Sequence, residues 1–162
     1  MGYDIWGRWS DSVGPFAPLC DSCAPTPKGS VASAVNNWVK AGFPAQKIIL
    51  GVSGAGQSYH VDSCTAYNAS GSIFPYVSFN KTLQPAGDKW DSTASGVDQC
   101  GNPNIVGGVF DLWGLVDAGF LNADGTVANG INYIFDQCSQ TVSHLNETSK
   151  SVFHPIDLNF DT

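Results

Sequence analysis

The feature that most constrains the fold is a succession of strand, helix and strand within the first 53 residues. Residues 1–5 read as a short strand that ends in Tyr-Asp, and residues 30–41 place apolar side chains at three- and four-residue intervals, as a helix does. Residues 47–53 read as a second strand, because residues 48–52 form a continuous apolar run, which is typical of a strand covered on both faces. This order predicts a right-handed parallel crossover unit and therefore an α/β fold.

The expected helix has clear signals at both ends. Ser30 is a good N-cap residue, and Gly42 follows the last helical turn as a C′ residue. We expect one face of this helix to lie against a sheet. Its apolar positions are Val31, Ala34, Val35, Trp38 and Val39.

The first ten residues concentrate side chains suited to ligand recognition. Tyr3 offers a hydroxyl donor beside the carboxylate acceptor of Asp4. The flat rings of Trp6 and Trp9 can stack on the apolar faces of sugar rings. The alternative is a buried strand end, in which these side chains bond to the backbone and fill space.

Several motifs occur together in a fixed order. Met-x-Tyr-Asp at residues 1–4 is followed by Gly7-x-Trp9 and by Gly-Pro-x-Ala-Pro-Leu at residues 14–19. The helix, the second strand and Gly-Ala-Gly-Gln-Ser-Tyr at residues 54–59 come next. In order and spacing these motifs resemble glycoside hydrolase family 18, the chitinases, from the sixth strand onward. The resemblance is closest to fungal-type secreted chitinases and extends in outline to about residue 150.

The resemblance implies a TIM (β/α)₈ barrel, which needs roughly 200 residues or more. With 162 residues the chain is too short for one, so we expect the C-terminal part of the catalytic domain. Residues 1–58 would be a partial barrel, with strands six and seven and the helix between them. Residues 59–150 would form a small α+β insertion subdomain. Residues 151–162 fit the family poorly and are interpreted as a divergent tail.

The family uses substrate-assisted catalysis, in which one Glu protonates the leaving oxygen and the acetamide oxygen of the substrate attacks the anomeric carbon. The resemblance implies that Tyr3 and Asp4 are the catalytic residues that hold this acetamide group. It also implies that Trp9 stacks on a sugar. The substrate-binding residues expected are Met1, Trp6, Trp9 and Gln57.

Two departures put hydrolysis in doubt. The Asp-x-x-Asp-x-Asp-x-Glu motif that carries the acid in the family has no match, and the one Glu, Glu147, lies in a solvated Asn-Glu-Thr sequon. Ala55-Gly56-Gln57 also replaces the Tyr-Gly-Arg or Tyr-Gly-His of the family. Two functions therefore stay open: part of a chitinase acting on β-1,4-linked N-acetylglucosamine, or a catalytically inactive, lectin-like chitin-binding protein. In either case we expect this chain alone to be inactive.

The composition limits the partners. The net charge is −7, and the seven Lys and Arg residues are not clustered, which argues against nucleic acid and anionic membrane surfaces. The sequence shows no apolar run long enough to span a membrane and no signal-peptide pattern. A neutral polysaccharide, chitin or chito-oligosaccharides, remains compatible.

Five cysteines and three sequons, at Asn68, Asn80 and Asn146, predict an extracellular parent protein. We expect a disulfide between Cys100 and Cys138, with Cys20–Cys23 as a second pairing left open. Too few Cys and His residues accompany the Cys-x-x-Cys pair for a zinc site, so we expect neither metal nor cofactor.

The expected insertion is harder to interpret. Residues 61–108 lack helical periodicity and predict loops, whereas the apolar residues between 110 and 135 alternate well enough for short antiparallel strands. Asp124-Gly125 predicts a turn. We interpret Trp90 and Trp113 as core residues of this subdomain, and no internal repeat is visible.

Overall fold

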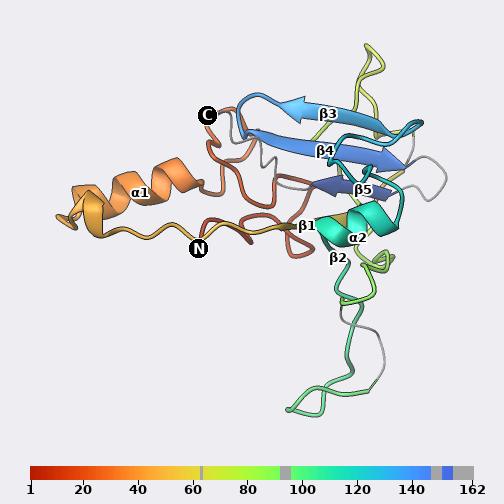
Figure 1. The fold of residues 1–162 in the computed structure, drawn as a ribbon, viewed down its shortest axis with the longest axis horizontal. Coiled ribbons are helices and arrows are strands. Elements are labelled where there is room, and N and C mark those ends of the chain that lie inside the picture. The colour runs from red at the N-terminus through yellow and green to blue at the C-terminus, as the bar shows by residue number, and fades with distance from the viewer. Residues whose placement is uncertain (63, 92–95, 147–150, 155–162) are drawn as a thin grey trace.

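A computed structural model describes residues 1–62, 64–91, 96–146 and 151–154 (Figure 1). The helices are α1 (Val31–Lys40), the short 3₁₀ helix η1 (Ala45–Lys47) and α2 (Leu112–Asp117). The strands are β1 (Ala55–His60), β2 (Val109–Asp111), β3 (Asn132–Asp136), β4 (Thr141–Asn146) and β5 (Ser151–His154).

The strands form one five-stranded sheet in the order β2-β1-β5-β4-β3. Every neighbouring pair is antiparallel, with Gln57 opposite Val109 in β1·β2 and Tyr133 opposite His144 in β3·β4. Antiparallel strands in the insertion, including one through Tyr133 and Phe135, are thus confirmed. The parallel sheet expected from the first 53 residues is not seen.

The two expected barrel strands do not form a ladder. Neither residues 1–5, where Asp4 has a φ of +58°, nor residues 48–52 belong to a strand, and one backbone hydrogen bond joins the two segments, from Gly2 N to Gly51 O at 2.9 Å. The partial barrel is therefore not confirmed. A parallel ladder needs continuous pairing and cover on both faces, and among the described residues neither segment has a second strand beside it.

Helix α1 has the predicted ends but not the predicted packing. Ser30 caps it in a capping box with Ser33, and Gly42 follows with φ of +90°. None of its residues is buried, however, and the Trp38 side chain is 60% exposed. Figure 1 shows why the expected burial of its apolar face is wrong here: α1 extends away from the sheet.

The segment between β2 and β3 contains α2, which the alternating pattern missed. The Asp111 carboxylate accepts a hydrogen bond from the Gly114 N–H at 2.8 Å, which caps the helix, and Gly119 with φ of +76° follows its end. An acidic cap before the apolar run and a glycine after it were visible helix signals.

Two apolar clusters stabilise the sheet region. The larger lies around β1 and β4 and consists of Val13, Tyr59, Val61, Ala66, Ile73, Val77 and Leu145. The smaller surrounds α2 and consists of Phe110, Leu115, Phe120 and Leu121. β1 crosses the boundary placed after residue 58, and β5 lies in the segment interpreted as a tail, so the proposed division 1–58, 59–150 and 151–162 stays a prediction.

Three loops share one hairpin, although no repeat was visible in the sequence. They span residues 67–73, 97–103 and 121–127, and each is closed by an isolated antiparallel bridge between its ends. In each, the second residue donates its N–H to the sixth at 2.8 Å, and a glycine at the fifth position has positive φ. The predicted Asp124-Gly125 turn is confirmed as one of them. Two of the tips project from opposite edges of the molecule (Figure 1).

The loop after Asp4 belongs structurally to the sheet region. Val13 N donates to Val77 O, and Leu19 N donates to Ser139 O, both at 2.8 Å. Cys23 forms a disulfide with Cys138, across 115 residues. The predicted Cys100–Cys138 pairing is wrong, because the Leu19–Ser139 contact brings Cys23 beside Cys138 while Cys100 lies free on an exposed hairpin.

Cys20 and Cys64 are the other free thiols among the described residues, so the Cys20–Cys23 alternative is also wrong. None of the helices in the described ranges is both long and apolar enough to cross a membrane.

Candidate functional site

Trp9 has the geometry of a stacking platform. Its side chain is 58% exposed, and its six-membered ring lies across the backbone of Gly7, where a Cβ atom would clash with it. The Ser10 N–H donates to Gly7 O at 2.8 Å and closes the turn that carries Trp9. The indole is thus held at one side and open to solvent elsewhere, which suits contact with a sugar face.

Tyr3 and Asp4 precede this turn with uncommitted polar groups. Neither side chain forms a hydrogen bond with a described residue. Asp4 is exposed and has φ of +58°, a left-handed conformation that is uncommon for a residue with a side chain. The Tyr3 ring packs beside Gly51, so its position depends on the contact between residues 1–5 and residues 48–52.

Trp6 lies inside the molecule. Its side chain is 1% exposed, and the ring packs against Gly14, against Tyr76 at 5.7 Å between centroids, and beneath the Lys28 ammonium at 5.2 Å. Its Nε1 has no hydrogen-bond partner among the described residues. This geometry gives Trp6 the role of an anchor for the loop, and its expected contact with substrate is untested.

The other two expected substrate-binding residues lie in different settings. Gln57 is buried in β1, where its Nε2 donates to Gly107 O at 3.0 Å and to Gly108 O at 3.1 Å. Met1 is almost fully exposed. The structure thus commits the Gln57 amide to backbone carbonyls of residues 107 and 108, whereas Tyr3, Asp4 and Trp9 are neighbours in sequence whose side chains are at least partly exposed.

A polar network lies on the inner side of the loop at residues 5–23, which is called the recognition loop below. The Tyr76 hydroxyl donates to the Asp136 carboxylate at 3.3 Å, and burial, followed by that carboxylate, raises the pKa of Tyr76. Asp136 also accepts from Ser139 Oγ at 2.7 Å. On the outer side Lys81 pairs with Asp11 at 3.0 Å, and its hydrogen bond lowers the pKa of that carboxyl. The Tyr76 ring that packs against Trp6 is therefore held in place by a hydrogen bond to Asp136.

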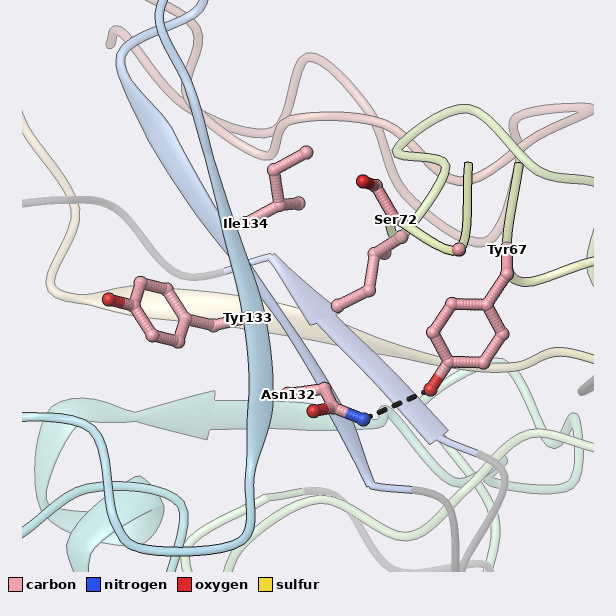
Figure 2. A pocket seen from close by; sticks show the side chains of 7 residues that line it. Tyr67, Ser72, Asn132, Tyr133 and Ile134 are labelled. Carbon is pink, nitrogen blue, oxygen red and sulfur yellow. Dashed lines mark hydrogen bonds between the residues drawn. The ribbon is translucent and has the colours of Figure 1, made fainter. Parts of the chain in front are cut away.

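A hollow that was not predicted from the sequence lies between β3 and the 67–73 hairpin. It has a volume of about 310 Å³ and is open to solvent. Figure 2 shows Asn132 and Ile134 pointing toward Tyr67 and Ser72, with a hydrogen bond of 3.1 Å from Asn132 Nδ2 to Tyr67 Oη, whereas Tyr133 points away. The alternation of a strand explains this arrangement, since residues 132 and 134 share a face.

His144 is a buried histidine of the sheet. It lies in β4 beside the Tyr133 ring, with Nδ1 lacking a hydrogen-bond partner among the described residues. Burial lowers its pKa from 6.5 to about 4. A neutral imidazole without an aligned partner is a packing group here, and it makes the sheet sensitive to acid.

The interpretation of Trp90 and Trp113 as core residues is wrong. The Trp90 side chain is 59% exposed with the Lys89 ammonium 4.1 Å from its ring centroid, and that of Trp113 is 70% exposed on α2. Phe110, Leu115 and Phe120 fill the core around α2 instead. Glu147 lies outside the described residues.

Comparison with known proteins agrees with the motifs. The model for glycosyl hydrolases family 18 matches residues 1–152. A chitinase-like effector of Moniliophthora perniciosa is 49% identical over 148 residues, covering 90% of this chain and 33% of that protein. A chitinase-like effector of Moniliophthora roreri is 46% identical, covering 87% and 35%. The chain thus spans about a third of the length of these two relatives.

A solved structure is also similar. The crystal structure of a chitinase from Rhizomucor miehei superimposes with a TM-score of 0.77 at 27% identity, covering 97% of this chain and 41% of that one. The match includes both the motif-bearing segment and the antiparallel sheet. On the sequence motifs, the family model and these relatives together, the chain belongs to glycosyl hydrolases family 18.

Proposed function

We propose that this chain recognises β-1,4-linked N-acetylglucosamine through Tyr3, Asp4 and Trp9. The observation that carries the proposal is that the hydroxyl and the carboxylate bond to no described residue, within six positions of an indole that is 58% exposed. A donor, an acceptor and a flat apolar face are the groups that bind an acetamido sugar. Membership of a family that contains chitinases supports this ligand class.

Each group has a separate task in this proposal. The Trp9 ring stacks on the apolar face of a sugar, a contact that contributes about 1 kcal/mol. The Asp4 carboxylate accepts from the acetamide N–H, and the Tyr3 hydroxyl donates to the acetamide oxygen. In substrate-assisted hydrolysis charge develops on that acetamide, so both bonds would strengthen at the transition state.

Recognition without turnover is the activity we propose for the chain as it stands. Its one Glu, Glu147, follows a sequon Asn, whereas an acid catalyst needs an apolar pocket that raises its pKa. The two relatives named chitinase-like effectors favour a lectin-like protein that binds chitin without cutting it. The chitinase from Rhizomucor miehei favours the second candidate, part of an enzyme whose acid lies outside these residues.

We also propose an extracellular location for the protein, with chitin or chito-oligosaccharides as partners. The Cys23–Cys138 disulfide supports an oxidising compartment, where such bonds persist. A neutral polymer suits a chain of net charge −7 that lacks a basic cluster.

Calorimetric titration tests the binding proposal. We expect chitohexaose to bind more tightly than cellohexaose, which lacks acetamides, and Asp4→Asn to reduce that preference. Trp9→Ala should weaken binding roughly fivefold, since it removes about 1 kcal/mol of stacking. The matched control is Trp38→Ala, because Trp38 is equally exposed at 60% but lies on α1. Equal losses for the two tryptophans would refute the proposed platform.

An activity assay tests whether this chain carries a catalytic acid of its own. The purified chain should not release the fluorophore from a chitobioside above the level of a boiled sample. Turnover that disappears on Glu147→Gln would assign the acid to this chain and contradict the lectin-like function.

A further inference from the structure

Two of the three sequons lie on exposed loops of the sheet region. Asn68-Ala69-Ser70 occupies the tip of the 67–73 hairpin. Asn80-Lys81-Thr82 begins where the Asn80 N–H donates to His60 O at 2.9 Å. Both asparagines are exposed. Residues 147 and 148 of the third sequon lie outside the described residues, so it takes no part in the inference.

The two asparagines share the same side-chain geometry. The Asn68 Oδ1 accepts hydrogen bonds from the N–H of Ser70 at 3.0 Å and from its hydroxyl at 2.6 Å. The Asn80 Oδ1 accepts from the N–H of Thr82 at 2.9 Å and from its hydroxyl at 2.7 Å. In neither case does Nδ2 donate a hydrogen bond to a described residue.

We propose that Asn68 and Asn80 are sites of N-linked glycosylation. The co-reactant is an oligosaccharide joined to a lipid through pyrophosphate. The bond between its anomeric carbon and the phosphate oxygen breaks, a bond from that carbon to the asparagine Nδ2 forms, and Nδ2 loses one proton as the lipid pyrophosphate leaves. The free Nδ2 is the atom that this step requires, and the hydroxyl two residues on defines the acceptor.

The third hairpin of the set offers a contrast within the same chain. Asn122 holds the position of Asn68 in the 121–127 hairpin, but Asp124 stands where Ser70 supplies the hydroxyl. The Asn122 Nδ2 is also engaged, donating to Thr126 Oγ1 at 2.9 Å and to Val127 O at 3.3 Å. The same backbone shape thus carries an acceptor at residue 68 and none at residue 122.

A glycan at Asn68 has a structural consequence. The hollow of Figure 2 is lined by Tyr67, Gly71 and Ser72, the residues on either side of Asn68 in this hairpin. An oligosaccharide attached there would stand at the rim of that hollow. The hollow would then be shielded by the protein's own sugar, and free chito-oligosaccharides would bind elsewhere.

Peptide mapping of the full chain tests the inference. The chain is directed into the secretory pathway of yeast by a cleavable leader, recovered from both cells and medium, and treated with an amidase that converts glycosylated Asn to Asp in heavy-oxygen water. We expect isotope-labelled Asp at residues 68 and 80 and unlabelled Asn at residue 122. Ser70→Ala should abolish the label at residue 68 and leave that at residue 80, which also controls for folding.

A gain-of-site variant gives the sharper test. Asp124→Ser supplies the hydroxyl in the matched hairpin, and Thr126→Ala removes the Oγ1 that accepts from the Asn122 Nδ2 at 2.9 Å, so the double variant should add a glycan at Asn122. The proposal is overturned if Asn68 and Asn80 are recovered without label while a co-expressed glycoprotein is labelled. A label at Asn68 with none at Asn122 in the double variant would overturn the hairpin geometry as its basis.

Discussion

Residues 1–53 and residues 55–154 differ in what they contribute to the molecule. The first region carries the motifs that resemble the family. Its helix α1 nevertheless buries no residue, and one backbone hydrogen bond joins residues 1–5 to residues 48–52. The second region holds every described strand and nearly all of both apolar clusters. The residues proposed for recognition and most of the described core therefore lie in different parts of the chain.

The recognition loop joins these two regions. Val13 packs into the core of the second region, Leu19 bonds to Ser139, and Cys23 is linked to Cys138. Trp9 thus stands on a loop that is held mainly by the sheet, while the first turn of α1 adds two backbone hydrogen bonds, from Val31 N to Pro18 O and from Ala32 N to Leu19 O, both at 3.0 Å. We expect changes in the second region to unfold the site, and changes on the exposed face of α1 to leave it intact.

Removal of the disulfide should have the largest effect. Cys138→Ser opens a loop of 115 residues, and the chain-entropy account predicts a loss of about 5 kcal/mol in the free energy of unfolding. Urea denaturation measures it, with the exposed free Cys100→Ser as the matched control. Identical midpoints for the two variants would show that the loop is held without the covalent link.

A cavity in the second region should lower the free energy of unfolding by less than loss of the disulfide does. Leu115 is fully buried, so Leu115→Ala should destabilise the chain by about 3 kcal/mol. Ile49→Ala in the first region removes a side chain of the same size that is 94% exposed, and should change stability by less than about 0.5 kcal/mol. Comparable losses in thermal denaturation would contradict the unequal division of stability.

Acid should weaken the second region through His144. Burial lowers its folded-state pKa to about 4, below the unfolded value of 6.5, so the unfolded chain takes up the proton first. The stabilisation is complete above pH 6.5 and is lost as the pH falls toward 4, by about 3 kcal/mol in total. His144→Gln should remove this part of the pH dependence. A parallel pH profile for the variant and the parent would contradict it.

The smallest effect concerns the position of one ring. Gly7→Ala places a methyl group against the Trp9 indole and should weaken chitohexaose binding roughly fivefold, as the loss of about 1 kcal/mol of stacking does. Gly54→Ala is the control, since a Cβ there meets no atom within 4 Å. If both variants bind as the parent does, the ring is not held by Gly7.

Local features were predictable from the sequence, and long-range ones were not. Ser30 and Gly42 define the ends of α1 through contacts within one turn, so composition and spacing were enough. The partner of Cys138 depends on where Leu19 meets Ser139, which no local pattern contains. Burial of the α1 face failed for the same reason, because it depends on what lies beside the helix.

The candidate site divides in the same way. Motifs placed Tyr3, Asp4 and Trp9 together because they are neighbours in sequence, and the structure shows their side chains accessible. The burial of Trp6 and the backbone bonds of Gln57 arise from residues 76 and 107–108, far along the chain. The hairpin repeat escaped notice because its shape needs only Asn or Asp and a glycine three residues later.

Hydrogen exchange with and without chitohexaose tests the central claim most directly, because it locates the ligand along the chain. The account predicts slower exchange in peptides that cover residues 3–19, with α1 and the hollow between Tyr67 and Asn132 unchanged. Slower exchange at that hollow, or at α1, with residues 3–19 unchanged would place the sugar elsewhere and contradict the account.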